Sequence, residues 1–407
     1  MNILFLSRWF PYPPDNGSRI RIFNLIKHLS LHNEIDLVSF AGQSVADEQL
    51  AAMQDYCRCV EIVRYQPFQS TRLNAILGFF SRRPRSVIDT YSLEMERLVQ
   101  RTARNHSIDL VIASQIDMAP YALTLPDTPK IFEEVELTTL YEQFVLQTHP
   151  LKKFRKGLMW WKLSHYAADI LQAFDGCTIV AGQERERVLQ VAPGYQPIWN
   201  VPNGVDTGYY AAGFGKPQAD TLVYAGALTY QANFDAVDYF LREIFPRIQA
   251  VRPQVKLFVT GKLEGVPVEQ LPQNEGVVYT GYLDDIRPRV AQSWCSIAPL
   301  RIGGGTRLKI LESLASGTPV VATSKGAEGL DLVPDKDLLI ADDPAEFAAA
   351  VLRLLQDETL RQKLSRNGRQ TVEATYDWQS IGFQFNNFIK TVVSRNGRHR
   401  EDCDDTG

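Results

Sequence analysis

Several familiar signals are scarce or missing in this chain of 407 residues. Its five cysteines form no CxxC pair, which argues against a zinc ribbon or a thioredoxin-like motif and favours a reducing cytoplasm. The net charge of −4 gives no global basic field that would attract nucleic acid. No apolar run reaches the roughly 18 residues of a membrane-spanning helix. The N-terminus lacks a basic segment, so it predicts a buried strand rather than a signal peptide.

What the chain has instead is a regular alternation of apolar β-type runs and helical patterns. Strands are expected at residues 2–7, 34–40, 60–65, 109–114, 130–134 and 177–181, and then at 221–226, 255–260, 276–280, 295–300, 318–323 and 337–341. Several runs are continuously apolar, as strands of a parallel sheet covered on both faces are. Helices are expected between them, for instance at 19–30 and 235–249. The pattern predicts an α/β protein of two doubly wound, Rossmann-like domains.

The domain boundary is expected in the segment 194–216, which is rich in glycine and proline and contains a turn signal at 201–206. We therefore predict an N-terminal domain at 1–200, a C-terminal domain at 201–375 and a last helix at 376–393. Residues 394–407 are polar and lack periodicity, which predicts a disordered tail.

The most informative segment is a glycine loop that follows an apolar run and opens a helix. It holds Gly303, Gly304 and Gly305. Glycine leaves backbone N–H groups unobstructed, and a helix N-terminus adds the positive end of its dipole, so the loop predicts a phosphate site. Arg307 and Lys309 add two cations at this end, and Thr306 is the expected N-cap.

Glu312 lies six residues beyond Thr306, which is about 9 Å along a helix. That is about the offset between the diphosphate and the ribose diol of a nucleotide. A carboxylate can accept from both hydroxyls of a diol, so we predict that Glu312 binds ribose. The alternative is a solvated glutamate on a surface helix.

Residues 303–321 resemble the donor-site signature of family 4 glycosyltransferases, which are retaining, metal-independent enzymes of GT-B fold. Further matches at 201–206, 223–228, 278–285 and 376–378 extend the resemblance over most of residues 202–389. It implies two domains facing across a cleft, a nucleoside diphosphate sugar as donor substrate, no cofactor and no metal. The donor contacts that it implies are Gly17, Gly226, Gly281, Tyr282, Leu283, Gly303, Gly304, Gly305, Thr306 and Glu312.

The chain also departs from the commoner pattern of this family. Gly304 stands where many members carry a glutamate that contacts the donor sugar, and residues 227–231 lack the cations that often grip the diphosphate. A division of the family carries the same GGGTRLK sequence. We hypothesise that Arg307 and Lys309 supply the missing positive charge and stabilise the leaving diphosphate.

In the first half the resemblance is weaker. It implies that the loop at 11–19 faces the donor phosphates through Gly17 and Arg19, whereas a plain reading makes this loop a proline-rich connector. Gln115 stands where the family often has a histidine, and it cannot carry a proton as imidazole does. In a front-face retaining mechanism the leaving phosphate itself can accept the acceptor's proton. Gln115, Glu134 and Arg19 are the acceptor-side candidates, and for Glu134 the alternative is an ordinary acidic loop.

These observations predict a retaining glycosyltransferase of the hexosyltransferase type, acting on a glycan or lipid-linked acceptor in cell-surface polysaccharide or glycolipid assembly. A sugar-nucleotide epimerase and a non-catalytic nucleotide-sugar-binding protein remain alternatives.

Two segments, 77–85 and 152–162, combine aromatic and basic residues, which suits the surface of an anionic membrane. A helix with buried aromatics and a solvated basic face would give the same pattern. We therefore expect a cytoplasmic protein, with peripheral membrane contact through Lys152–Lys162 as an open alternative.

Overall fold

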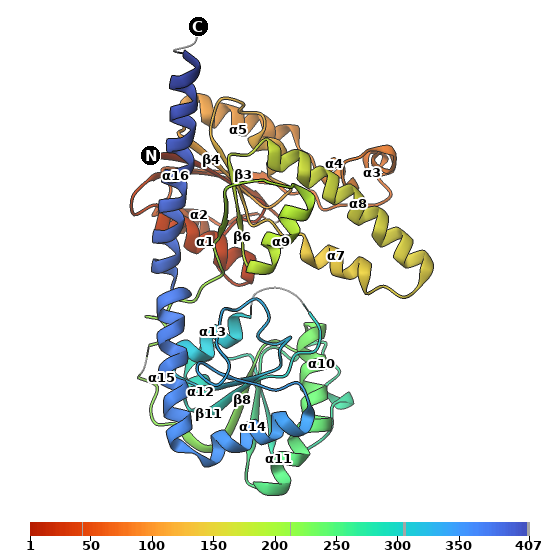
Figure 1. Ribbon diagram of the computed structural model, residues 1–407, viewed down its shortest axis with the longest axis vertical. Coiled ribbons are helices and arrows are strands. Elements are labelled where there is room, and N and C mark those ends of the chain that lie inside the picture. The colour runs from red at the N-terminus through yellow and green to blue at the C-terminus, as the bar shows by residue number, and fades with distance from the viewer. Residues whose placement is uncertain (43, 212, 304–306, 405–407) are drawn as a thin grey trace. The chain divides into compact units, whose positions relative to one another are not determined.

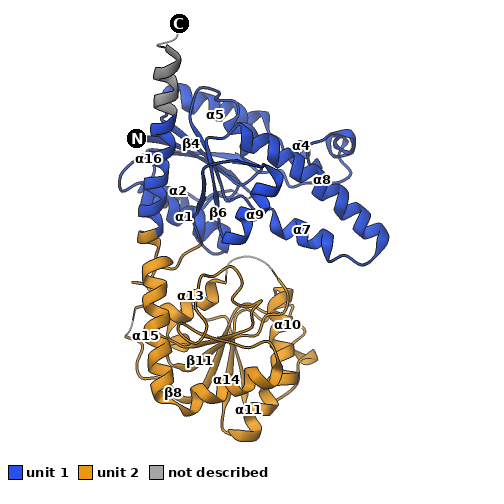
Figure 2. Cartoon of the chain, in the orientation of Figure 1, with its two compact units in different colours: residues 1–202, 381–407 blue, residues 203–380 orange. Residues whose placement is uncertain are grey.

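The computed structural model describes residues 1–42, 44–211, 213–303 and 307–404, with side chains as far as Arg395. The chain forms two compact units (Figure 2). Unit 1 contains Met1–Pro202 and Ile381–Gly407, and unit 2 contains Asn203–Ser380.

Unit 1 is a seven-stranded parallel sheet in the order β3-β2-β1-β4-β5-β6-β7, with helices on both faces (Figure 1). Its strands are β1 (Asn2–Ser7), β2 (Glu34–Ala41), β3 (Cys59–Arg64), β4 (Leu110–Ser114), β5 (Lys130–Glu133), β6 (Gly176–Ile179) and β7 (Ile198–Asn200). Its helices before the last one are α1 (Gly17–Leu29), α2 (Asp47–Gln54), α3 (Leu73–Leu77), the 3₁₀ turn η1 (Gly78–Phe80), α4 (Arg85–Asp89), α5 (Leu93–Asn105), α6 (Ala119–Ala122), α7 (Thr138–Val145), α8 (Pro150–Gln172) and α9 (Gly182–Val191).

Unit 2 is a six-stranded parallel sheet in the order β10-β9-β8-β11-β12-β13. Its strands are β8 (Gln218–Ala225), β9 (Lys256–Thr260), β10 (Val277–Gly281), β11 (Ser293–Ala298), β12 (Val320–Ala322) and β13 (Leu339–Ile340). Its helical elements are α10 (Gln231–Tyr239), the π turn η2 (Phe240–Ile244), α11 (Phe245–Val251), the 3₁₀ turn η3 (Val268–Gln270), α12 (Arg287–Ala291), α13 (Leu308–Ala315), α14 (Pro344–Gln356) and α15 (Glu358–Thr375).

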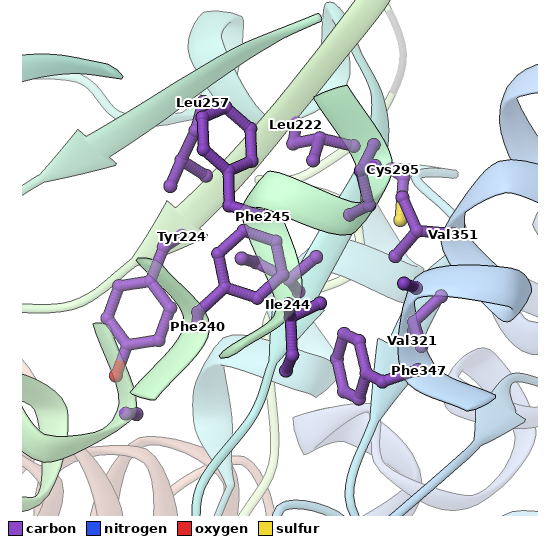
Figure 3. Packing of buried hydrophobic residues seen from close by; sticks show 14 of the residues in the cluster. Leu222, Tyr224, Phe240, Ile244, Phe245, Leu257, Cys295, Val321, Phe347 and Val351 are labelled. Carbon is purple, nitrogen blue, oxygen red and sulfur yellow. The ribbon is translucent and has the colours of Figure 1, made fainter. Parts of the chain in front are cut away.

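The strands form where continuous apolar runs predicted them because both sheet faces are covered. Ile3 to Leu6 of β1 have no exposed surface. In unit 2 the aromatic rings of Phe240, Phe245 and Phe347 pack over the central strands (Figure 3). The short edge strand β7 was not expected, because Ile198–Asn200 is too brief to give a periodic signal and its Trp199 is exposed.

The helix expected at 235–249 is interrupted. It divides into α10, η2 and α11, and Pro246 lies in the first turn of α11. Proline has no N–H to donate to the preceding turn, which accounts for the local change to π geometry. Helix α13 begins at Leu308 with Arg307 at the N-cap position, and the predicted cap Thr306 lies outside the described residues.

The last helix, α16, runs from Trp378 to Asp404 and belongs to unit 1 from Ile381 onward. Phe385, Phe388 and Ile389 are buried, and Asn386 accepts a hydrogen bond from Asn33 at 2.9 Å. Helical backbone thus continues to Asp404 in the segment 394–407, for which we had expected disorder. A helix already nucleated by packing extends at low cost through good helix formers such as arginine and glutamate.

Within the described part of the chain, no helix combines the length and the apolarity needed to span a bilayer.

Each sheet has a switch point, where the connections change direction along the sheet. It lies between β1 and β4 in unit 1 and between β8 and β11 in unit 2. Open α/β sheets bind ligands beyond the carboxyl ends of the strands at such points. The sequence-predicted site residues follow these strand ends.

Candidate functional site

In unit 2 the ammonium group of Lys309, in the first turn of α13, is held against the loop that follows β8. Its Nζ donates to the Tyr224 hydroxyl at 2.8 Å and to Asn233 Oδ1 at 2.7 Å. A Cβ added to Gly226 would lie 3.1 Å from this Nζ, so glycine permits the close approach. Burial lowers the pKa of Lys309 from 10.5 to about 7, with a further contribution from the charge of Arg307.

The carboxylate of Glu312 lies one turn further along α13. It accepts a hydrogen bond from the hydroxyl of Tyr210 and lies near the charge of Lys309. Burial raises the pKa of Glu312, and these two partners oppose that rise. The alternative of a solvated surface glutamate does not fit this burial. Glu312 is a half-buried acceptor, and its two carboxylate oxygens can accept from both hydroxyls of a diol.

Arg307 is buried and turned onto the glycine loop. It donates to the Gly303 carbonyl at 3.0 Å and lies 3.4 Å from Oε2 of Glu328, to which Lys325 also binds at 2.6 Å. Gly303 has φ of +101°, and a Cβ there would come within 2.9 Å of the Ala232 Cβ. This backbone geometry is accessible to glycine and strained for other residues.

The remaining predicted donor contacts of unit 2 lie at the end of β10 or outside the described residues. Gly281 has φ of +69° and ends the strand, and Tyr282 after it is 64% exposed. The Lys262 ammonium lies 5.5 Å from the centre of the Tyr282 ring. An exposed aromatic face at a strand end can stack on a planar base. Gly304, Gly305 and Thr306 lie outside the described residues.

In unit 1, Gln115 and Glu134 follow adjacent strands, β4 and β5. Both have left-handed backbones, with φ of +71° and +60°, and Gln115 Nε2 donates to Glu134 Oε2 at 2.9 Å. Such conformations cost about 1–3 kcal/mol each in residues other than glycine and concentrate at functional sites. Burial and the neighbouring Glu133 raise the pKa of Glu134 to about 7. This value suits a group that exchanges protons near neutral pH.

These two residues line a cavity of about 260 Å³ that also includes Arg8, Trp9 and Asp117. Arg8 pairs with Asp117 at 2.5 Å, and its guanidinium lies 4.9 Å from the Trp9 ring centre. Burial raises the pKa of Asp117 although Arg8 opposes the rise. Carboxylates, an amide and an aromatic face are the groups that bind sugar hydroxyls and the apolar faces of sugar rings.

The predicted acceptor-side residue Arg19 is not among the groups that line this cavity. It pairs with Asp15 at 3.1 Å, and Gly17 begins the same helix as an exposed residue. The fully buried arginine beside Glu134 is Arg21, whose Nη2 lies 2.6 Å from Glu133 and whose Nε lies 4.0 Å from Glu134. Sequence reasoning missed Arg21 because it lies two residues after Arg19, on nearly the opposite side of α1, and the sequence does not show which side faces the strand ends.

Sequence reasoning also missed Tyr210, Tyr224 and Asn233, which shape the surroundings of Lys309 and Glu312. Asn233 lies in the first turn of α10, directly after the glycine turn at Gly226. A polar residue at the start of a helix beside a glycine turn was the available signal. For Tyr210 we find no local signal, because it lies in an irregular segment after the interdomain turn.

Comparisons with known proteins agree with this architecture. Residues 219–357 match the family described as "Glycosyl transferases group 1". The chain is 19% identical over 404 residues to an uncharacterized 44.6 kDa protein in the cps region of Klebsiella pneumoniae, with 93% of this chain and 97% of that protein covered. It is 29% identical over 228 residues to the MMP alpha-(1->4)-mannosyltransferase of Mycolicibacterium hassiacum, an alignment that spans 54% of each chain.

Solved structures match over nearly the whole chain. Sucrose-phosphate synthase from Thermosynechococcus elongatus superimposes with a TM-score of 0.66 at 16% identity, covering 97% of this chain and all of that chain. HepE of Anabaena in complex with UDP also gives 0.66, at 14% identity over 96% of this chain and all of the other. Two parallel-sheet, Rossmann-like units with these matches define the GT-B fold, as predicted. The match to a glycosyltransferase family is confined to residues 219–357, within unit 2, and the likeness to solved structures gives the fold of the whole chain.

Proposed function

We propose that this protein is a retaining glycosyltransferase that moves a sugar from a nucleoside diphosphate sugar to a hydroxyl acceptor without a metal ion. The observation that carries the proposal is the arrangement at the switch point of unit 2. There the Lys309 ammonium, the half-buried Glu312 carboxylate and the glycine loop at Gly303 lie together at the start of α13. The distance along the helix from the loop to Glu312 is about the distance from a diphosphate to a ribose.

Unit 2 binds the donor in this proposal. The ammonium of Lys309 contacts the diphosphate, Gly226 lets that ammonium lie close to the turn after β8, and backbone N–H groups at the start of α13 face the phosphate oxygens. Glu312 accepts from the ribose hydroxyls, and Tyr282 stacks on the base. Lys309 becomes fully protonated as the anion approaches, and it then stabilises the leaving diphosphate.

Arg307 has a different part in the proposal. Its guanidinium holds the Gly303 carbonyl, so it fixes the shape of the loop and adds positive charge behind Lys309. Removal of Arg307 is therefore expected to weaken donor binding by at least tenfold, about 1.4 kcal/mol.

Unit 1 binds the acceptor in this proposal, in the cavity at the ends of β1, β4 and β5. Gln115 and Glu134 meet the incoming hydroxyl, and Trp9 packs on an apolar face of the acceptor. The leaving phosphate takes the acceptor's proton in the front-face mechanism of the resembling family, so Glu134 orients the hydroxyl rather than replacing that base. At the start of α1, Arg19 remains a further acceptor-side candidate and Gly17 a donor-side one.

The names of related proteins support the choice of donor and acceptor class. HepE has been solved with UDP-glucose, and TarM with UDP and alpha-GlcNAc-glycerol. WaaG is described as a glycosyltransferase involved in lipopolysaccharide biosynthesis. We infer that a nucleotide sugar is the donor here as well, and that a glycan or lipid-linked hydroxyl is the acceptor.

A thermal-shift panel of UDP-, GDP-, TDP- and ADP-sugars tests the donor site, because a ligand that binds only the folded protein raises its melting temperature. We expect one base to stabilise the protein, and we expect Glu312→Gln to abolish that shift. Glu346→Gln removes an exposed carboxylate elsewhere in unit 2 and should leave the shift unchanged. A panel with no stabilising nucleotide would refute the donor assignment.

Product analysis with the stabilising donor then separates the alternatives. Transfer, or slow donor hydrolysis with retained configuration in the presence of EDTA, supports the proposal. Conversion of the donor to its epimer would identify an epimerase. Binding with neither transfer nor hydrolysis would identify a non-catalytic nucleotide-sugar-binding protein.

A further inference from the structure

The tip of the α7–α8 hairpin in unit 1 exposes large apolar side chains. Leu146, Leu151 and Phe154 are 75%, 77% and 76% exposed. Figure 1 shows the two helices, drawn in yellow, extending away from the sheet as a hairpin. Between them lies an almost wholly apolar groove of about 480 Å³, where Gly157 lets the ring of Phe144 approach α8.

A second segment of unit 1, α3 with η1, exposes apolar side chains in the same way. Phe80 is 88% exposed, Leu73 69% and Leu77 57%. Arg82 and Arg83 follow directly and are exposed as well. Single exposed apolar residues are common on proteins, but a run of them on two short neighbouring elements marks an interaction surface.

Lys162 of α8 joins the two segments. Its buried ammonium donates to the carbonyls of Gly78 at 3.0 Å and Phe79 at 2.8 Å. Burial and the charge of Arg85 lower the pKa of Lys162. We call residues 70–88 and 145–162 together the basic apolar surface. Lys162 is thus a structural residue of this surface, and its own ammonium group is not available for contact with a membrane.

The charge of this surface identifies its partner. Residues 70–88 contain four arginines, of which Arg72 pairs with Asp89 just beyond this range, and residues 145–162 contain four lysines or arginines besides the buried Lys162. Neither range contains aspartate or glutamate. The chain as a whole has a net charge of −4. A local concentration of cations beside exposed Leu and Phe side chains matches the interface of an anionic bilayer, where headgroups meet acyl chains.

We propose that the basic apolar surface binds the protein peripherally to anionic lipid bilayers. Phe80, Leu151 and Phe154 insert among the headgroups and upper acyl chains. Lys152, Lys153, Arg155 and Lys156 lie at the level of the lipid phosphates. This proposal is independent of the transfer reaction, since it concerns a surface built from unit 1 alone.

Cosedimentation of the full chain with vesicles tests the surface. We expect binding to equimolar phosphatidylcholine and phosphatidylglycerol, and much weaker binding to phosphatidylcholine alone. Each cation near an anionic surface contributes about a fivefold gain in binding. The charge variant replaces four hairpin cations with glutamine: Lys152→Gln, Lys153→Gln, Arg155→Gln and Lys156→Gln. It should therefore bind at least about a hundredfold more weakly.

A matched control removes four exposed cations of unit 2: Arg247→Gln, Lys256→Gln, Lys363→Gln and Arg366→Gln. It changes the net charge equally and should retain vesicle binding. A separate variant with Phe80→Ser, Leu151→Ser and Phe154→Ser keeps the charges and should lose the part of the binding that survives high salt. Its melting curve should match that of the unchanged protein, because these side chains are exposed.

Three outcomes would overturn the proposal. One is binding that does not depend on anionic lipid, and another is equal loss in the charge variant and its control. The third is a concentration-dependent dimer that disappears in the serine variant while vesicle binding is absent, which would assign the surface to a second copy of the chain. Because vesicle binding is measured without substrate, none of these results bears on the donor or acceptor sites.

Discussion

Proton uptake on donor binding is the sharpest consequence of the position of Lys309. Its pKa falls from 10.5 to about 7 in the ligand-free protein because the ammonium is buried beside Arg307. At pH 8 only about a tenth of the molecules carry this charge. A bound diphosphate places negative charge beside the ammonium and returns the pKa toward its ordinary value. Binding at pH 8 should therefore take up about 0.9 proton per donor molecule.

The sign follows from linkage. The complex binds one more proton than the free protein above pH 7, so donor affinity falls as pH rises, by up to tenfold per pH unit, about 1.4 kcal/mol. Stability of the free protein shows the opposite trend. Its folded-state pKa lies below the unfolded value, so the unfolded chain binds more protons between about pH 7 and 10.5, and this contribution to stability rises with pH across that window.

Isothermal titration calorimetry at pH 8, in two buffers with different ionisation enthalpies, counts the protons directly. The ligand is a nucleotide sugar, whose diphosphate is a diester and has no second phosphate ionisation. Lys309→Arg keeps a permanent charge, so it should bind with no uptake. Glu134→Gln removes the other described group whose pKa is shifted to about 7, and it should leave the uptake unchanged. Uptake below roughly a quarter of a proton, or equal uptake in Lys309→Arg, would refute this reasoning.

Three further predictions concern single residues. The value of kcat/KM for the acceptor should rise with pH through about pH 7 as Glu134 ionises. The variant Glu134→Gln should lose this rise and about a hundredfold in rate. An unchanged pH–rate profile in the variant would contradict the assignment. Arg21→Met leaves the buried carboxylate of Glu133 without its cationic partner. It should lower the free energy of unfolding of unit 1 by about 3–5 kcal/mol in urea titrations. A loss below about 1 kcal/mol, which is typical of exposed ion pairs, would contradict this reasoning. Gly303→Ala forces a Cβ to within 2.9 Å of Ala232 at a positive φ, and it should weaken donor binding by about tenfold in calorimetry. Gly182→Ala, whose Cβ meets nothing within 4 Å, is its control.

The sheet architecture was predictable because parallel strands buried on both faces give continuous apolar runs. The runs at residues 2–7 and 255–260, for example, became β1 and β9 with little change in bounds. Departures occurred where one residue overrode the pattern. Pro246 changed a predicted single helix into two helices with a π turn, and β7 was too short to be seen.

The two basic segments show a limit of a different kind. Composition alone allowed either buried aromatics or exposed ones, because a helical pattern does not say which face meets the core. The structure shows that both kinds of aromatic residue occur in the same segment. Trp160 packs on Tyr141 with ring centres 5.2 Å apart, whereas Phe154 is exposed and Lys162 is buried.

The sequence by itself determined the spacing of Gly303, Lys309 and Glu312, because all three lie along one loop and one helix. Local geometry fixes that spacing whatever the rest of the chain does. The tertiary structure alone decided the protonation of these groups and their partners. Tyr210, Tyr224 and Asn233 reach the helix from distant segments, and the pairing of Gln115 with Glu134 joins two strands. A pKa depends on how much water is excluded and which charges lie nearby, and only the folded chain sets both.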